Sequence, residues 1–118
     1  MGGGPCVAVA TDDGLEVKLG HFGDARYYFH YKPGPRGWEL VRVVENPWRG
    51  GHHGGGEEGK RGRIYEANSE CSVIVATALG PGGREYMESR GLRVVIVKPR
   101  TSVREALEAA ARALAARA

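Results

Sequence analysis

The chain has 118 residues, of which 42% are apolar and 26% are charged, and its formal net charge is +3. This length and composition are typical of one soluble globular domain and exclude a disordered chain. The positive charge is small and forms no concentrated block, so it favours anionic ligands without indicating a nucleic-acid partner. All apolar runs are far shorter than the ~20 residues that cross a bilayer, so we expect a cytoplasmic protein without a membrane partner.

Cysteine and amide content indicate the environment of the protein. Cys6 and Cys71 lie far apart and form no Cys-x-x-Cys pair, so the sequence predicts neither a disulfide framework nor a metal or redox motif. A reducing compartment fits this usage. We expect Cys71 to be a small buried apolar residue and Cys6 to be an exposed thiol. Glutamine is absent and asparagine is rare, whereas arginine and glutamate are plentiful, a bias typical of heat-adapted proteins.

The first half of the chain predicts three strands and a loop. Residues 1–4 are a glycine-rich, disordered lead, and residues 7–11 form a buried strand that ends at the turn Asp12-Asp13-Gly14. Two aromatic and β-branched runs follow at 27–31 and 40–44. Prolines and glycines in residues 32–37 join these runs as an antiparallel hairpin. Residues 47–59 are dominated by glycine and histidine, which predicts a mobile loop.

The second half alternates helices and buried strands. The predicted helices cover residues 57–69 and 81–89 and a last segment from residue 103, and the predicted strands cover residues 73–78 and 94–97. A Ser-x-x-Glu capping box at Ser102 and Glu105 opens the last helix. Its predicted buried stripe consists of Val103, Ala106, Leu107, Ala110 and Leu114.

This order of elements predicts one α/β domain over residues 1–118, built as a three-layer α/β/α arrangement. Right-handed crossovers place the fourth strand beside the first, which gives a mixed five-stranded sheet of order 3-2-1-4-5 with only strand 2 antiparallel. Loops at one edge of such a sheet are where α/β proteins bind ligands. The edge collects the Asp12 turn, the segment His21-Phe22-Gly23, the glycine-histidine loop and the segment Gly80-Pro81-Gly82-Gly83.

Histidines and glycines at this edge are the candidate binding residues. His21 lies between Gly20 and Phe22, where little bulk covers it, and imidazole is a good ligand for iron, zinc or copper. A surface histidine bonded to the backbone is the alternative. His52 and His53 are the other candidate metal ligands, and a solvated loop is the alternative for them. Residues 80–83 either hold an anion on free helix amides or make a tight turn.

The sequence offers no constellation for catalysis. Asp12 and Asp13 resemble the start of a two-metal nuclease site, but the partner acids are missing, which favours turn-forming aspartates. No serine has a nucleophile-elbow sequence, and the phosphate-binding and dinucleotide-binding glycine fingerprints are absent. We therefore expect a binding protein that is not an enzyme.

Several segments together resemble the dinitrogenase iron-molybdenum cofactor biosynthesis family, which contains nitrogenase accessory factor-like domains. The similar segments are residues 7–14, 21–25, 44–47, the glycine-histidine loop, 78–83 and the final helix. The resemblance covers nearly the whole chain. It implies a ribonuclease H-like motif with the sheet order given above.

The resemblance also implies a non-enzymatic carrier for an iron-sulfur or iron-molybdenum cofactor precursor. His21 would be the first metal ligand, and His52 or His53 would close over the cluster. Asp12, Phe22, Gly23, Gly80, Gly82 and Gly83 would form the cofactor-binding surface. The expected partners are the metallocluster and cluster-assembly or acceptor proteins, and the purified protein can lack the cluster.

Two further classes of function stay open. The glycine turn and the positive charge fit a small-molecule or phosphate sensor, and the domain also fits a protein-interaction module that binds no metal.

Overall fold

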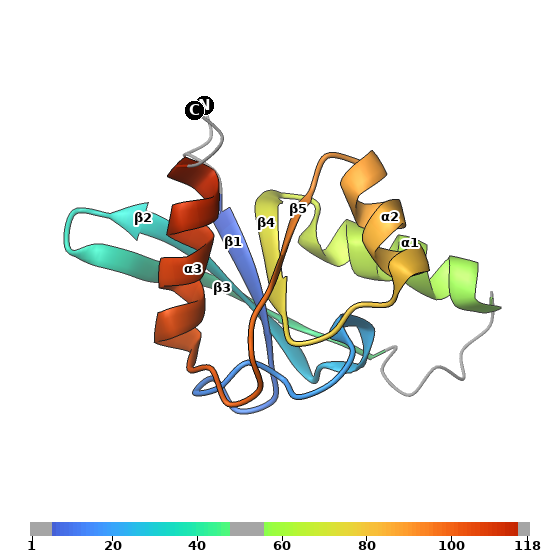
Figure 1. Cartoon of the computed structure of the whole chain (residues 1–118), viewed down its shortest axis with the longest axis horizontal. Helices are drawn as coiled ribbons and strands as arrows, with labels where there is room; N and C mark the ends of the chain where they lie inside the picture. The colour runs from blue at the N-terminus through green and yellow to red at the C-terminus, as the bar shows by residue number, and fades with distance from the viewer. Residues whose placement is uncertain (1–5, 48–55, 116–118) are drawn as a thin grey trace.

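The computed structural model of the chain describes residues 6–47 and 56–115, with side chains from residue 59 onward in the second range (Figure 1). Its strands are β1 (Cys6–Thr11), β2 (Tyr27–Gly34), β3 (Gly37–Glu45), β4 (Cys71–Ala76) and β5 (Arg93–Ile96). Its helices are the short 3-10 helix η1 (Phe22–Asp24), α1 (Gly56–Asn68), α2 (Pro81–Ser89) and α3 (Val103–Ala115).

The five strands form one mixed sheet in the order β3-β2-β1-β4-β5. β2 is antiparallel to β1 and β3, whereas β4 is parallel to β1 and to β5. The predicted α/β fold, the strand order and the single antiparallel strand are therefore confirmed. This topology places the carboxyl ends of β1 and β4 at the same edge of the sheet.

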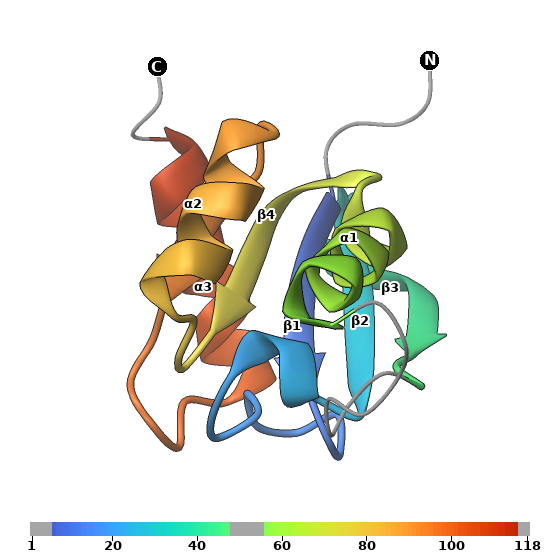
Figure 2. The ribbon, with the colours of Figure 1, turned by 90° about the vertical axis from the view of Figure 1, so that its right-hand side faces the viewer.

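Helices pack on both faces of the sheet (Figures 1 and 2). On one face, Ile64 of α1 and Met87 of α2 join a core with the even-numbered side chains of β1. On the other face, α3 covers the valines of β1 and β4. The two cores follow from the alternation of side chains along a strand. Ala8 and Ala10 face α1 and α2, and their small side chains leave room for the paired residues His30 and Tyr28 of β2.

The capping box of α3 is confirmed. The Ser102 hydroxyl accepts a hydrogen bond from the Glu105 backbone N–H at 3.0 Å, and the Glu105 carboxylate accepts one from the Ser102 N–H at 3.1 Å. Four of the five predicted stripe residues are buried, and Leu114 packs against the same core. Within the described ranges, no helix has the length and apolarity that crossing a bilayer requires.

The hairpin and the first helix differ from their predicted bounds. Strand pairing continues to Gly34 and Gly37, so only two residues connect β2 and β3, and the predicted reversing loop over 32–37 is too long by four residues. Pro33 fits in β2 because β1 pairs only as far as Tyr31, which leaves β2 a single neighbour there. Helix α1 begins at Gly56, so the predicted loop over 47–59 is wrong over its last four residues. Residues 48–55 lie outside the described residues.

Candidate functional site

A pocket of about 340 Å³ opens at the edge of the sheet where β1 and β4 end. Its lining residues come mainly from η1, α1 and the start of α2. Figure 2 shows α1 and α2 side by side on one face of the sheet. The pocket lining contains six of the predicted site residues: His21, Phe22, Gly23, Gly80, Gly82 and Gly83. The pocket volume falls in the range of small-molecule sites, about 300–1,000 Å³. The structure thus brings together segments that are far apart in the sequence.

His21 is positioned by backbone contacts with the end of β4. The backbone N–H of Phe22 donates a hydrogen bond to the Ala78 carbonyl at 2.9 Å, and His21 and Ala78 form an isolated β-bridge. Gly20 has a φ of 116°, a conformation that favours glycine, and its N–H donates to the Thr77 hydroxyl at 2.9 Å. The His21 side chain itself is exposed at the pocket. A histidine held this way can act as a ligand without moving the backbone.

Buried hydrogen bonds and one aromatic contact hold η1 in place. Phe22 is fully buried against Tyr28, with ring centroids 4.8 Å apart, and the Tyr28 hydroxyl donates to the Phe22 carbonyl at 2.7 Å. Burial, reinforced by the charge of Asp24, raises the pKa of Tyr28 above its ordinary value, so the hydroxyl stays protonated. The Asn46 amide donates to the carbonyls of Gly23 and Ala25 at 2.9 and 2.8 Å. These positioning roles of Tyr28 and Asn46 were not predicted from the sequence.

The rim of the pocket carries positive charge. Lys60 of α1 pairs with Asp24 at 2.7 Å, and Arg61 lies over Gly82, where an added Cβ would come within 2.7 Å of the guanidinium. At the start of α2, the first helical hydrogen bond runs from Arg84 N–H to the Gly80 carbonyl. The N–H groups of Gly82 and Gly83 therefore have no partner within the helix. Such free amides, together with the helix dipole, favour anions.

Asp12 lies outside this pocket. Its carboxylate accepts a hydrogen bond from the Arg26 backbone N–H at 2.8 Å and pairs with Lys18 at 3.2 Å, which ties the first turn to the start of β2. It lines a separate hollow beside Lys18 and Arg100. Asp13 accepts the N–H groups of Leu15 and Glu16, so its predicted turn-forming role is confirmed. His52 and His53 fall outside the described residues, and their roles as ligands stay predictions.

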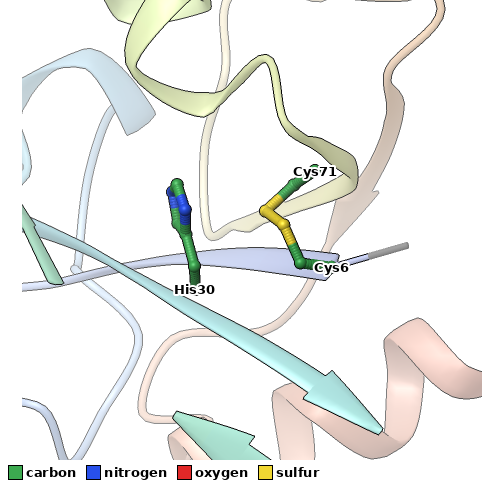
Figure 3. Close-up of side chains that lie close together, drawn as sticks. All are labelled: Cys6, His30 and Cys71. Carbon is green, nitrogen blue, oxygen red and sulfur yellow. A yellow bond between two sulfur atoms is a disulfide. The ribbon is translucent and has the colours of Figure 1, made fainter. Parts of the chain in front are cut away.

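A second cluster of candidate metal ligands lies toward the amino ends of β1 and β4, away from the pocket. Figure 3 shows its three side chains. Cys6, His30 and Cys71 are all buried, and one ligand atom from each lies within 4.8 Å of the other two. A ring nitrogen of His30, Nε2, lies 2.9 Å from the Asn68 Oδ1. Burial lowers the pKa of His30 below its ordinary value, which keeps the ring neutral at neutral pH. His30 was not among the site residues predicted from the sequence.

Cys71 is buried as predicted, but the prediction of an exposed Cys6 thiol and of no disulfide was wrong. Cys6 and Cys71 are joined by a disulfide, and Cys6 is 2% exposed rather than an exposed thiol. The parallel pairing of β1 with β4 places them as partners with Cα atoms 4.3 Å apart. Their 65-residue separation hid this contact, and the predicted strands, which began at residues 7 and 73, left both cysteines outside the sheet.

The fold and the pocket define a small α/β domain with a pocket at one end of its central strands, and comparisons with known proteins give its family. Residues 4–113 match the model of the dinitrogenase iron-molybdenum cofactor family, and the chain belongs to this family. The resemblance found in the sequence is thereby confirmed.

Named relatives agree with this family. A curated relative, the FeMo cofactor biosynthesis protein NifB of Frankia alni, is 34% identical over 92 residues. That match covers 75% of this chain but only 18% of the length of NifB. The NMR structure of a putative NifB protein from Thermotoga has a TM-score of 0.62 at 22% identity, covering 92% of this chain and 89% of that one. A second protein, solved by crystallography, has a TM-score of 0.61 at 22% identity, with coverages of 91% and 88%. Both structures support the fold alone.

Proposed function

We propose that this chain is a non-enzymatic carrier domain for an iron-sulfur or iron-molybdenum cofactor precursor. The cargo binds in the pocket between η1 and the start of α2, with His21 as a metal ligand. The proposal combines the family, which is associated with FeMo cofactor biosynthesis, with the chemistry of the pocket. In a ribonuclease H-like, three-layer domain of this kind, the sheet edge is a rigid platform for the binding loops.

One observation carries the proposal: an exposed imidazole shares a pocket with free helix amides and basic side chains. Imidazole supplies a metal ligand, and iron-sulfur clusters carry negative charge when thiolates or sulfides complete their coordination. The amides of Gly82 and Gly83 and the charge of Lys60 offset that negative charge. A cluster can therefore be held by one strong ligand and by several weaker contacts, which suits a protein that passes its cargo on.

The same lining favours binding over catalysis. The described residues that line the pocket include no serine, threonine or cysteine, so it offers no hydroxyl or thiol nucleophile. Among the lining residues that the structure describes, the one carboxylate is that of Asp24, which is paired with Lys60. A carrier needs none of these groups.

Anaerobic reconstitution with Fe²⁺ and sulfide tests the proposal. We expect the wild-type chain to take up iron with the visible absorption of a cluster, and His21→Ala to lose most of both. The measurement is repeated in a Cys6→Ala/Cys71→Ala background, so that cysteine thiolates cannot assemble a cluster elsewhere. A His52→Ala/His53→Ala variant tests the two remaining predicted ligands.

The iron content and absorption of each His21→Ala protein are compared with those of the protein that has the same residues at positions 6 and 71. Equal iron content and equal absorption for His21→Ala and wild type would show that His21 is not a ligand. Circular dichroism of each variant checks that the comparison is made between folded proteins.

A phosphate-binding sensor is the second candidate function, and the amides at the start of α2 favour it. A ligand that binds only the folded state raises the melting temperature. A higher melting temperature with inorganic phosphate, lost in Lys60→Ala and unchanged in His21→Ala, would support the sensor over the carrier.

A further inference from the structure

The buried cluster of Cys6, Cys71 and His30 is independent of the pocket. The cysteines are the first residues of β1 and β4, whereas the pocket lies where these strands end. Five residue steps along a strand separate the two edges by roughly 16 Å. All three side chains of the cluster project into the core beneath α1 and α2, where His30 is 1% exposed (Figure 3).

The hydrogen bonds of Asn68 define which ring nitrogen of His30 carries a lone pair that could bind a metal ion. The Asn68 amide nitrogen donates to the Ile64 carbonyl at 2.9 Å, so the amide oxygen is the atom that faces His30. That oxygen can only accept, which makes Nε2 of His30 the protonated nitrogen. The other nitrogen, Nδ1, carries the lone pair, and it has no hydrogen-bond partner among the described residues.

A buried acceptor without a partner costs free energy, and in native proteins such an atom commonly has a functional explanation. A metal ion bound to Nδ1 would satisfy its lone pair. Metal-binding histidines usually donate their second ring N–H to a carbonyl or carboxylate oxygen, which fixes the tautomer and the ring orientation. The Oδ1 of Asn68 already accepts the Nε2–H of His30 in this way. The cluster therefore contains one imidazole ligand with its outer-shell partner in place, and two sulfurs beside it.

We propose that Cys6, Cys71 and His30 form a redox-gated site for one thiophilic divalent metal ion, of which Zn²⁺ is the representative. A dithiol reductant transfers two electrons and two protons to the disulfide and itself becomes a disulfide. The two thiols formed on Cys6 and Cys71 then lose their protons as the ion binds both sulfurs and Nδ1. In the reverse direction, a small-molecule disulfide accepts two electrons from the two thiolates and becomes two thiolates itself, so the Cys6–Cys71 bond re-forms, both sulfur ligands are lost and the ion is released.

Charge and ligand chemistry favour this class of ion. Two thiolates and one divalent cation sum to zero, so the filled site is neutral in an apolar core, where an unpaired charge would be costly. Thiolate and imidazole ligands select zinc, copper and iron over the hard ions magnesium and calcium. Zn–S and Zn–N bonds are about 2.3 and 2.0 Å long, so the two sulfurs must move apart after reduction. Three protein ligands leave one position open for a small ligand.

Cobalt titration of the whole chain tests the site, because thiolate-bound Co²⁺ absorbs in the near ultraviolet. The protein is reduced anaerobically with a phosphine, which becomes a phosphine oxide by taking oxygen from water. We expect the reduced protein to bind one equivalent of Co²⁺ with a thiolate charge-transfer band, and Zn²⁺ to abolish the band. The oxidised protein should show no band. This comparison needs no substitution.

Variants assign the ligands. Cys71→Ser should lose the band, and His30→Gln should bind Co²⁺ at least about tenfold more weakly. Asn68→Ala keeps all three ligands and should weaken binding by about 10- to 100-fold. The band persists in His21→Ala, which separates this site from the pocket. Reduced wild type that takes up no Co²⁺, or His30→Gln that binds as tightly as wild type, would overturn the proposal.

Discussion

The carboxylate of Asp13 is held by the backbone of its own turn. It accepts the N–H groups of Leu15 and Glu16 at 2.8 and 3.1 Å, and these bonds lower the pKa of the carboxyl below its ordinary value. A group with a lower pKa in the folded state stabilises the fold above its unfolded pKa of ~3.9. That stabilisation is lost as the pH falls through the folded pKa.

We therefore predict a steeper acid dependence for wild type than for Asp13→Asn. Asparagine keeps an oxygen acceptor for the two N–H groups but does not titrate. Urea unfolding at several pH values between about 5 and 3 measures the free energy of unfolding of each protein. Equal slopes against pH for the two proteins would contradict the assigned role of Asp13.

The hydroxyl of Tyr28 has a structural role that can be separated from its ring. It donates to the Phe22 carbonyl and accepts a hydrogen bond from the Asn46 amide at 3.1 Å, so its removal leaves buried polar groups with fewer partners. We predict that Tyr28→Phe lowers the free energy of unfolding by about 1 to 2 kcal/mol. The matched control is Tyr27→Phe, on the half-buried opposite face of β2, which should change stability by less than about 0.5 kcal/mol. Chemical denaturation measures both.

At the scale of elements, the stability of α3 depends on the hydrogen bonds that cap its first turn. The reciprocal hydrogen bonds between Ser102 and Glu105 satisfy donors that the helix itself leaves unpaired. Ser102→Ala should cost about 1 kcal/mol of stability. Ser89→Ala, at the exposed end of α2, is the matched control and should be within about 0.5 kcal/mol of wild type. Thermal unfolding of the two variants compares them directly, and equal melting temperatures would contradict the capping role.

Elements with local signals were predictable from the sequence. The apolar run of β1, the Pro-Gly-Gly start of α2 and the capping box of α3 each specify structure within a few residues. The hairpin was predicted too short because Pro33 argues against a strand, and it is tolerated only where β2 lacks a second neighbour. That condition depends on strand pairing, which local sequence does not contain.

The candidate sites also contain features that the sequence predicts and features that depend on contacts between distant residues. Chain topology alone predicted that His21 and Gly80 meet at one edge, because His21 precedes the antiparallel strand that begins there and Gly80 follows a strand that ends there. The Thr77 hydroxyl, the Asn46 amide and the His30–Asn68 pair depend on side-chain contacts across long sequence separations. No spacing rule marks such contacts. The register of parallel strands that start together would have revealed the cysteine pair, but nothing in the sequence gives this register directly.

At the scale of the molecule, the disulfide joins two strands whose other ends carry the pocket. Reduction removes a cross-link that closes a loop over a separation of 65 residues, and chain entropy assigns such a link about 4 kcal/mol. Measured disulfides range around 2 to 4 kcal/mol. We predict a loss of this size in the free energy of unfolding when the metal-free protein is reduced.

Zn²⁺ should restore part of that stability if the reduced cysteines and His30 bind it. At a free concentration 100 times the dissociation constant, a ligand specific to the folded state adds about 2.7 kcal/mol. Urea unfolding of the oxidised, reduced and Zn²⁺-loaded reduced protein measures the three states. The Cys6→Ala/Cys71→Ala protein should resemble the reduced form and respond to neither reductant nor Zn²⁺. An equal response of that variant to Zn²⁺ would place the ion elsewhere on the chain, and the pocket histidine would then be the first alternative to examine.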